Sequence, residues 1–142
     1  MLDINFMLVV SLAVLAGMIF HQIWYAPRMF GDEWMKLAHV SKTNAAKGRE
    51  NKFLITCFSL FALATTLFTI ITWAGAKTAL TGVLVGIWIG CGVAGITLML
   101  PFLWEGRPVR LFLITAGHQI ISIIIMCALM AHAIGKFSLP AG

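Results

Sequence analysis

Four long apolar stretches without a charged side chain constrain this chain more than any other feature. They cover residues 4–24, 53–73, 79–104 and 111–134, and none contains Asp, Glu, Lys or Arg. A helix rises 1.5 Å per residue, so about 20 residues cross the ~30 Å hydrocarbon core of a bilayer. Helices also satisfy their own backbone hydrogen bonds in lipid. We therefore predict an all-α integral membrane protein, a bundle of four transmembrane helices that forms one membrane domain over residues 1–142.

Composition and charge agree with a membrane protein. Charged residues make up 11% of the chain, whereas a soluble domain carries roughly 25%. The net charge of +5 is basic enough to suggest a nucleic-acid partner, but its distribution gives a different reason. Eight basic residues lie in the connections between spans one and two and between spans three and four: Arg28, Lys36, Lys42, Lys47, Arg49, Lys52, Arg107 and Arg110. The remaining connection, between spans two and three, and the two tails have only Lys77 and Lys136.

This asymmetry predicts the orientation of the chain. Cytoplasmic loops of membrane proteins carry an excess of Lys and Arg. We expect the two basic connections to be cytoplasmic and both termini to lie outside. The basic charge then reports topology, and no nucleic-acid partner is expected.

The cytoplasmic connection, residues 25–52, has the pattern of a short interfacial amphipathic helix. Pro27 ends the first helix, Asp32 is the expected N-cap of the short helix, and Ser41 is the expected cap of a further turn. Trp34, Leu37 and Ala38 fall on one face, and Glu33 and Lys36 on another. Trp24, Tyr25 and Trp34 are typical anchors at the headgroup level.

The third span carries small residues at every fourth position, Gly82, Gly86, Gly90 and Ala94. Such a row lets two helix backbones approach closely in lipid. The pattern predicts tight helix packing but leaves the partner open: another helix of the same subunit, or the same row of a second copy.

Polar side chains inside the spans predict a polar bundle interior. On the fourth helix, Thr115, His118, Gln119 and Ser122 share one face, and the first helix offers His21 and Gln22. A threonine face on the second helix (Thr65, Thr66, Thr69 and Thr72) is expected to line the same interior. Groups of this kind cannot face lipid without losing hydrogen bonds.

Three interpretations of this interior stay open. The side chains either hydrogen-bond between helices, or mark a proton or ligand path, or hold a cofactor such as haem between His21 and His118. The haem alternative lacks an attachment motif, and the two histidines differ in depth by about 5 Å at helical rise. Glu105 is expected to pair with Arg107 at the hairpin turn, or alternatively to reach inward toward Tyr25 or His21.

Catalytic and metal-binding motifs are missing from the sequence. It has no nucleophile elbow, phosphate-binding glycine loop, His-Glu-x-x-His helix or paired catalytic carboxylates. Three cysteines without a Cys-x-x-Cys pair do not indicate a zinc site. We expect no metal and no cofactor, and consider an enzyme the weaker possibility.

Two motifs at helix ends carry a family resemblance. They are Trp24-Tyr25-Ala26-Pro27 with Phe30-Gly31 and Trp34, and Phe102-Leu103-Trp104-Glu105-Gly106-Arg107-Pro108 with the downstream Gly117-His118. Together they resemble the small bacterial membrane family known as domain of unknown function 1761. The resemblance implies a compact four-helix protein of the bacterial inner membrane and no assigned reaction. His21 and the basic run after Ser41 depart from that family's pattern.

The function expected from the sequence is that of a non-enzymatic membrane subunit. Its partners are the lipid bilayer and either a second copy of itself or another membrane protein, so that it forms a homo-oligomer or part of a larger complex. The tryptophan motif and the Glu-Gly-Arg-Pro turn are expected to lock the helices together. The alternative is a small transporter or channel that moves a proton, ion or small solute past His118, and a weaker one is a cofactor-binding or enzymatic membrane protein.

Overall fold

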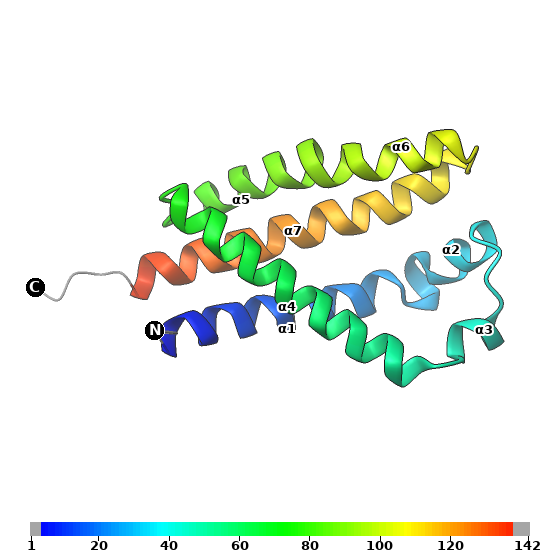
Figure 1. Cartoon of the computed structure of the whole chain (residues 1–142), viewed down its shortest axis with the longest axis horizontal. Helices are drawn as coiled ribbons and strands as arrows, with labels where there is room; N and C mark the ends of the chain where they lie inside the picture. The colour runs from blue at the N-terminus through cyan, green and yellow to red at the C-terminus, as the bar shows by residue number, and fades with distance from the viewer. Residues whose placement is uncertain (1–3, 138–142) are drawn as a thin grey trace, which may run out of the picture.

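The structure is a computed structural model that describes residues 4–137, and its regular structure within that range is helical (Figure 1). Four helices are long and apolar enough to cross a membrane: Asn5–Trp24, Arg49–Trp73, Ala79–Trp104 and Val109–Phe137. The element order is α1 (Ile4–Trp24), η1 (Pro27–Gly31), α2 (Asp32–Leu37), α3 (Lys42–Ala46), α4 (Arg49–Trp73), α5 (Ala79–Ile87), η2 (Trp88–Gly95), α6 (Ile96–Trp104) and α7 (Val109–Phe137). The predicted fold class is confirmed.

Helix bounds differ from the apolar stretches at three places. α4 begins at Arg49, four residues before the apolar stretch, and α7 runs from Val109 to Phe137, beyond the predicted 111–134. Both helices can extend beyond the hydrocarbon core because the long basic side chains at their ends keep their charged groups in water. The third span is interrupted by a wider π-helical stretch, η2, that is rich in glycine and small residues.

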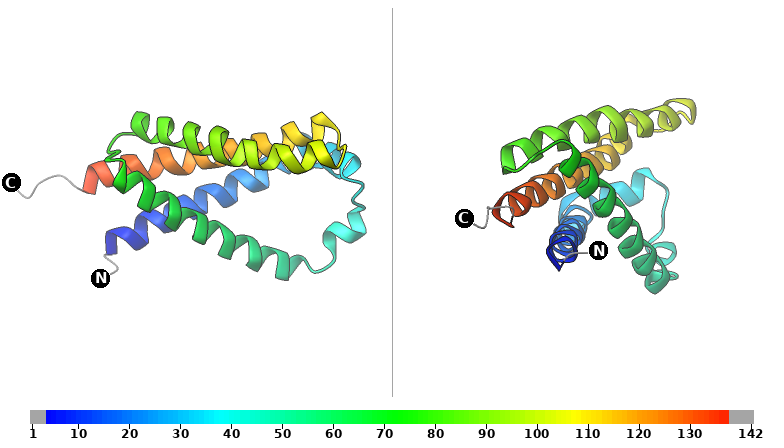
Figure 2. Two further views of the ribbon diagram at one scale, coloured as in Figure 1. Left: turned by 45° about the horizontal axis from the view of Figure 1, so that its top comes forward. Right: turned by 60° about the vertical axis from the view of Figure 1, so that its left-hand side comes forward.

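Helix α7 is the central element of the bundle. The α5–η2–α6 helix lies along one side of it, α1 lies along another, and α4 crosses α1 at an angle (Figures 1 and 2). Nine side chains in the core, each at most 3% exposed, come from the first half of α1 and the second halves of α4 and α7: Val9, Val10, Ala13, Ala64, Leu67, Ile71, Ile123, Met126 and Met130. This apolar core fills the end of the bundle where the chain enters α1.

The small-residue row of the third span packs against α7 of the same chain. A Cβ atom on Gly82 would lie 2.5 Å from the Cys127 carbonyl oxygen, and one on Gly86 would lie 2.7 Å from Ile124 Cα. Gly90 faces Ile120 in the same way, at 3.2 Å from its Cγ2. Ala94 is half-buried and packs against the core. These glycines therefore pack against α7 of the same chain and cannot also contact a second copy.

The connection between α1 and α4 contains the expected short helices. α2 spans Asp32–Leu37, and Ser41 Oγ accepts a hydrogen bond from the Asn44 amide at 3.2 Å as the cap of α3. The expectation that Asp32 caps α2 is wrong, because the cap residue is Gly31, which makes no side-chain cap bond. The Gly31 amide already donates to Ala26 O at 3.1 Å, so the chain is turning before Asp32 is reached.

The basic connections lie at one end of the bundle. Figure 1 shows α2, α3 and the turn between α6 and α7 at that end, opposite the turn between α4 and α5 and the start of α1. The turn into α7 needs Gly106, whose φ of +62° is in the left-handed region that favours glycine. The Arg107 amide closes this turn by donating to Phe102 O at 3.1 Å.

Candidate functional site

Trp24 anchors the end of α1 to α7. Its indole Nε1 donates a hydrogen bond to Ile114 O at 3.1 Å. The ring also lies on Gly117, where an added Cβ atom would be 3.5 Å from the indole. Phe30 covers its other side, with ring centroids 4.5 Å apart. Trp24 thus joins the first helix to the last.

His118 of α7 lies among aromatic side chains of α1. Its ring stacks on Phe20 with centroids 5.6 Å apart and an interplanar angle of 10°. Tyr25 lies 5.0 Å away and His21 lies 5.1 Å away in an edge-to-face arrangement. We call the group Phe20, His21, Trp24, Tyr25, Phe30, Trp34 and His118 the aromatic–histidine cluster. Trp34 joins it from α2, 5.6 Å from Tyr25.

The cluster leaves one polar atom unsatisfied. Among residues 4–137, His118 Nε2 is the buried side-chain nitrogen or oxygen without a hydrogen-bond partner. Neutral imidazole has one donor and one acceptor nitrogen, so a buried ring without partners loses a hydrogen bond that water would supply. Tyr25, which directly follows α1, is half-buried, and this burial raises the pKa of its phenol.

The predicted polar interior is only partly assembled. His21 and His118 meet, and Ser122 is buried with its Oγ directed to Met126 Sδ at 4.0 Å on the same helix. Thr115 and Gln119 are half-buried, and Gln22 is exposed outside the cluster. The interior therefore contains a histidine pair, without the complete polar lining that the sequence predicted.

The threonine face of α4 does not line this interior. Each of its four hydroxyls, in Thr65, Thr66, Thr69 and Thr72, donates to the carbonyl four residues earlier in the same helix. Thr66 and Thr72 are exposed. The expectation was wrong because a threonine hydroxyl can satisfy itself on its own helix and then tolerate lipid.

The turn motif lies apart from the cluster. Trp104 is 89% exposed, and Gly106 and Pro108 are exposed as well. Glu105 pairs with Arg107, and both side chains are about half exposed. The pairing is the one expected at the hairpin turn. The side chains of the motif project outward, and the expectation that it locks the helices together stays a prediction.

Two contacts in this region were not predicted from the sequence. Glu33 of α2 pairs with Arg110 in the first turn of α7, which joins the two basic connections. Phe20 stacks on His118, although the sequence shows it only as one more apolar residue of α1. Its position at i−4 from Trp24, on the same helix face, was the available signal.

The residues of the cluster offer little for metal or haem binding. Within residues 4–137, no group of three or more His, Cys, Asp or Glu side chains is placed to hold a metal ion. The His21 and His118 rings touch each other edge to face, and this contact leaves no space for a haem plane between them. The cluster can exchange a proton or accept a hydrogen bond at His118, and it can fix α1 and α2 to α7.

A small multi-pass helical membrane protein is therefore defined, with its first helix fastened to its last by a tryptophan and a histidine pair. The chain belongs to the family described as Protein of unknown function (DUF1761), whose pattern matches residues 8–131. The match runs from α1 through most of α7 and includes both helix-end motifs, so the resemblance noted in the sequence is confirmed. No curated protein and no solved structure matches the chain.

Proposed function

We propose that this chain is a non-enzymatic subunit of a membrane assembly, either a homo-oligomer or a larger complex. The supporting observation is the closely packed apolar core of the bundle. Three side chains that fill the bundle centre beyond the histidine pair, Leu67, Ile71 and Met130, are at most 1% exposed. A polar solute that crossed a single subunit would have to displace this packed apolar layer, which protein interiors resist.

Exposed apolar surface supports an assembly as well. Long apolar side chains cover the outward faces of α1 and α4, including Leu12, Leu15, Phe58 and Leu54. Such a surface can be covered either by lipid or by another transmembrane helix. The subunit proposal assigns part of this surface to a second chain.

We place the protein in the bacterial inner membrane with its basic end in the cytoplasm. The support is the concentration of eight basic residues at one end of the bundle, together with the resemblance to a small bacterial membrane family. Both termini then face the periplasm. A periplasm-specific reporter fused to the C-terminus is expected to be active, and an inactive fusion would reverse this orientation.

A transporter or channel is the second candidate, and one observation favours it. His118 Nε2 is buried without a partner next to His21, and intramembrane histidines often belong to proton paths. This candidate requires a wetted path from the cluster to the far side of the membrane.

Two measurements separate these functions. Native mass spectrometry of the solubilised full chain is expected to show a multimer or a co-purified membrane chain. In proteoliposomes, a pH-sensitive dye is expected to report no more proton flux than in protein-free vesicles. A chain that stays monomeric and alone in every detergent and lipid tested contradicts the subunit proposal.

A matched pair of variants tests the transport alternative. His118 and His132 lie on the same helix, but His132 is exposed near the other end. Transport would be established if His118→Ala abolished the proton flux while His132→Ala retained it. The unfolding midpoint of His118→Ala would also have to be unchanged. Loss of fold or of the oligomer in His118→Ala would instead indicate a structural role for the cluster.

A further inference from the structure

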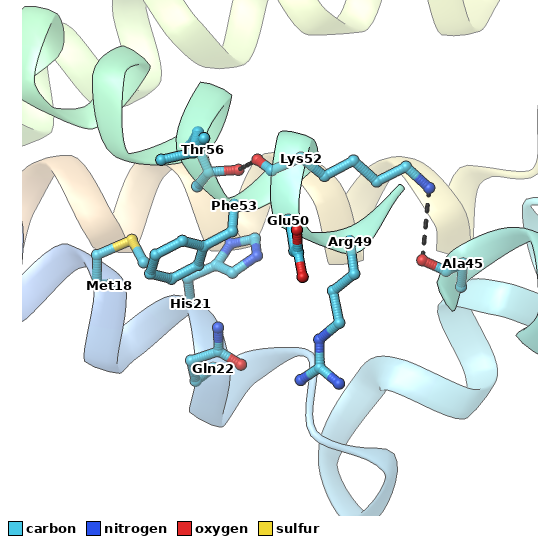
Figure 3. A pocket seen from close by; sticks show the side chains of 10 residues that line it. Met18, His21, Gln22, Ala45, Arg49, Glu50, Lys52, Phe53 and Thr56 are labelled. Atoms are coloured by element: carbon cyan, nitrogen blue, oxygen red, sulfur yellow. Dashed lines mark hydrogen bonds between the residues drawn. The ribbon is translucent and has the colours of Figure 1, made fainter. Parts of the chain in front are cut away.

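A cleft opens between α1 and α4 on the outside of the bundle. The two helices cross and then diverge toward α3 (Figure 2), which leaves a space of about 660 Å³ between them. This volume is in the ~300–1,000 Å³ range of small-molecule sites. Figure 3 shows Met18 and Gln22 of α1 on one side, facing Arg49 and Phe53 of α4 on the other.

The polar end of this cleft holds two cations, and one of them has no hydrogen-bond or ion-pair partner. Lys52 Nζ donates to the carbonyl oxygens of Asn44 at 3.0 Å and Ala45 at 3.4 Å, so two of its three hydrogens are engaged. Arg49 and Glu50 also line the cleft, and within residues 4–137 neither side chain makes a hydrogen bond or an ion pair. The guanidinium of Arg49 is therefore a cationic donor without a partner, in a form that suits the oxygens of a phosphate.

The other end of the cleft is apolar and continues along α1. Phe53 and Leu54 line it, and Leu54 is 65% exposed. Leu15, Met18 and Gln22 follow each other at helical spacing on one face of α1. A separate groove of about 420 Å³ lies nearer the start of α1, where Leu8, Leu12 and Leu15 line it. From Leu8 to Gln22 the helix rises about 21 Å, more than the ~15 Å of one leaflet's hydrocarbon.

We propose that this cleft binds one anionic glycerophospholipid. Arg49 donates to the phosphodiester, Glu50 accepts a hydrogen bond from a hydroxyl of the headgroup, and an acyl chain lies along the apolar face of α1. Basic pockets between transmembrane helices at the cytoplasmic side commonly hold anionic headgroups. A lipid is favoured over a free phosphate compound because the apolar side chains of Phe53 and Leu54 line the same cleft as Arg49. This proposal leaves Leu15 and Leu54 to the lipid, so that a second chain would pack elsewhere on the exposed apolar surface.

The test is lipid titration of the full chain in a neutral detergent, followed by native mass spectrometry. The probes are phosphatidylglycerol, phosphatidylcholine with the same acyl chains, and glycerol 3-phosphate. Phosphatidylglycerol is expected to bind in a ratio of one per chain. Phosphatidylcholine is expected to bind at least ~10-fold more weakly, because its ammonium group carries no hydroxyl and adds a positive charge beside Arg49.

One variant and a matched control test the role of Arg49. Arg49→Gln is expected to weaken phosphatidylglycerol binding at least ~10-fold, since it removes a charged hydrogen-bond donor. Arg28→Gln makes the same charge change on an exposed residue of the same connection that does not line the cleft, and it is expected to change binding less than about threefold. Circular dichroism checks that each variant keeps its helices.

Three outcomes would overturn the proposal. Equal weakening by Arg49→Gln and Arg28→Gln would show a diffuse charge effect without a site. Glycerol 3-phosphate that binds as tightly as the lipid would identify a soluble phosphate ligand. If phosphatidylcholine binds more tightly than phosphatidylglycerol and Arg49→Gln leaves phosphatidylglycerol binding unchanged, the cleft selects a cationic headgroup.

Discussion

Replacing Gly82 with alanine tests how closely α5 approaches α7. The added Cβ atom would lie 2.5 Å from the Cys127 carbonyl oxygen, 2.8 Å from Ala128 Cα and 2.8 Å from the Ala131 Cβ atom. Ordinary contact for such an atom begins near 3.4 Å. Two of the three obstructing atoms belong to the backbone of α7, so no rotation of a flexible side chain can relieve the overlap.

The helices must therefore separate by roughly 0.9 Å at this level, which loosens the packing of neighbouring side chains. Overpacking of this kind typically costs about 1–3 kcal/mol. Gly92 provides a matched control on the same span, because nothing lies within 4 Å of a Cβ atom placed there. Gly92→Ala is expected to be neutral or to stabilise the helix by up to ~1 kcal/mol, since alanine restricts the unfolded chain more than glycine.

The assay is reversible unfolding in mixed detergent micelles, followed by circular dichroism for the wild-type chain and both variants. The free energy of unfolding of Gly82→Ala should be lower than that of Gly92→Ala by about 1–4 kcal/mol. Equal stabilities would refute the close approach of α5 and α7. An unchanged free energy of unfolding with a smaller oligomer mass in Gly82→Ala would place the glycine row between copies.

Two further substitutions test the contacts that fasten α1 and α2 to α7. Trp24→Phe removes the hydrogen bond to Ile114 O but keeps an aromatic ring, and it is expected to lower the free energy of unfolding by about 0.5–1.5 kcal/mol; an unchanged value in the same assay would contradict this anchor. Glu33→Gln breaks the partly exposed pair with Arg110, and it is expected to cost no more than ~1 kcal/mol. This loss should shrink as salt is raised because exposed charges are screened, and a salt-independent loss would argue against an ion pair.

The helices and the end of the bundle to which each connection belongs were predictable from local sequence. Lipid leaves few options for an uncharged run such as residues 79–104, because its backbone groups must bond to one another. Ser41 was also recognised as a cap, because a cap bond joins residues only three positions apart. Predictions of this kind need no knowledge of which helices are neighbours.

The candidate site was predicted less completely. Placing polar side chains toward the interior correctly brought His21 and His118 together. It was wrong for the α4 threonines, because each hydroxyl bonds within its own helix. The pairing of Glu33 with Arg110 joins residues 77 positions apart in the chain, and no local pattern reveals such a contact.

The amino-acid sequence alone determined that this chain crosses the bilayer four times as helices, since length and hydrocarbon solvation set that outcome residue by residue. It also determined that one end of the bundle is basic. Only the tertiary structure decided that the glycine row packs against α7 rather than against a second copy. It also decided that Trp104 faces outward while Trp24 is hydrogen-bonded to α7. The divergence of α1 and α4, which leaves a cleft beside Arg49, is likewise a tertiary feature. Those outcomes depend on which helix faces meet, and in lipid they are set by shape and close packing, because no hydrophobic force draws the helices together.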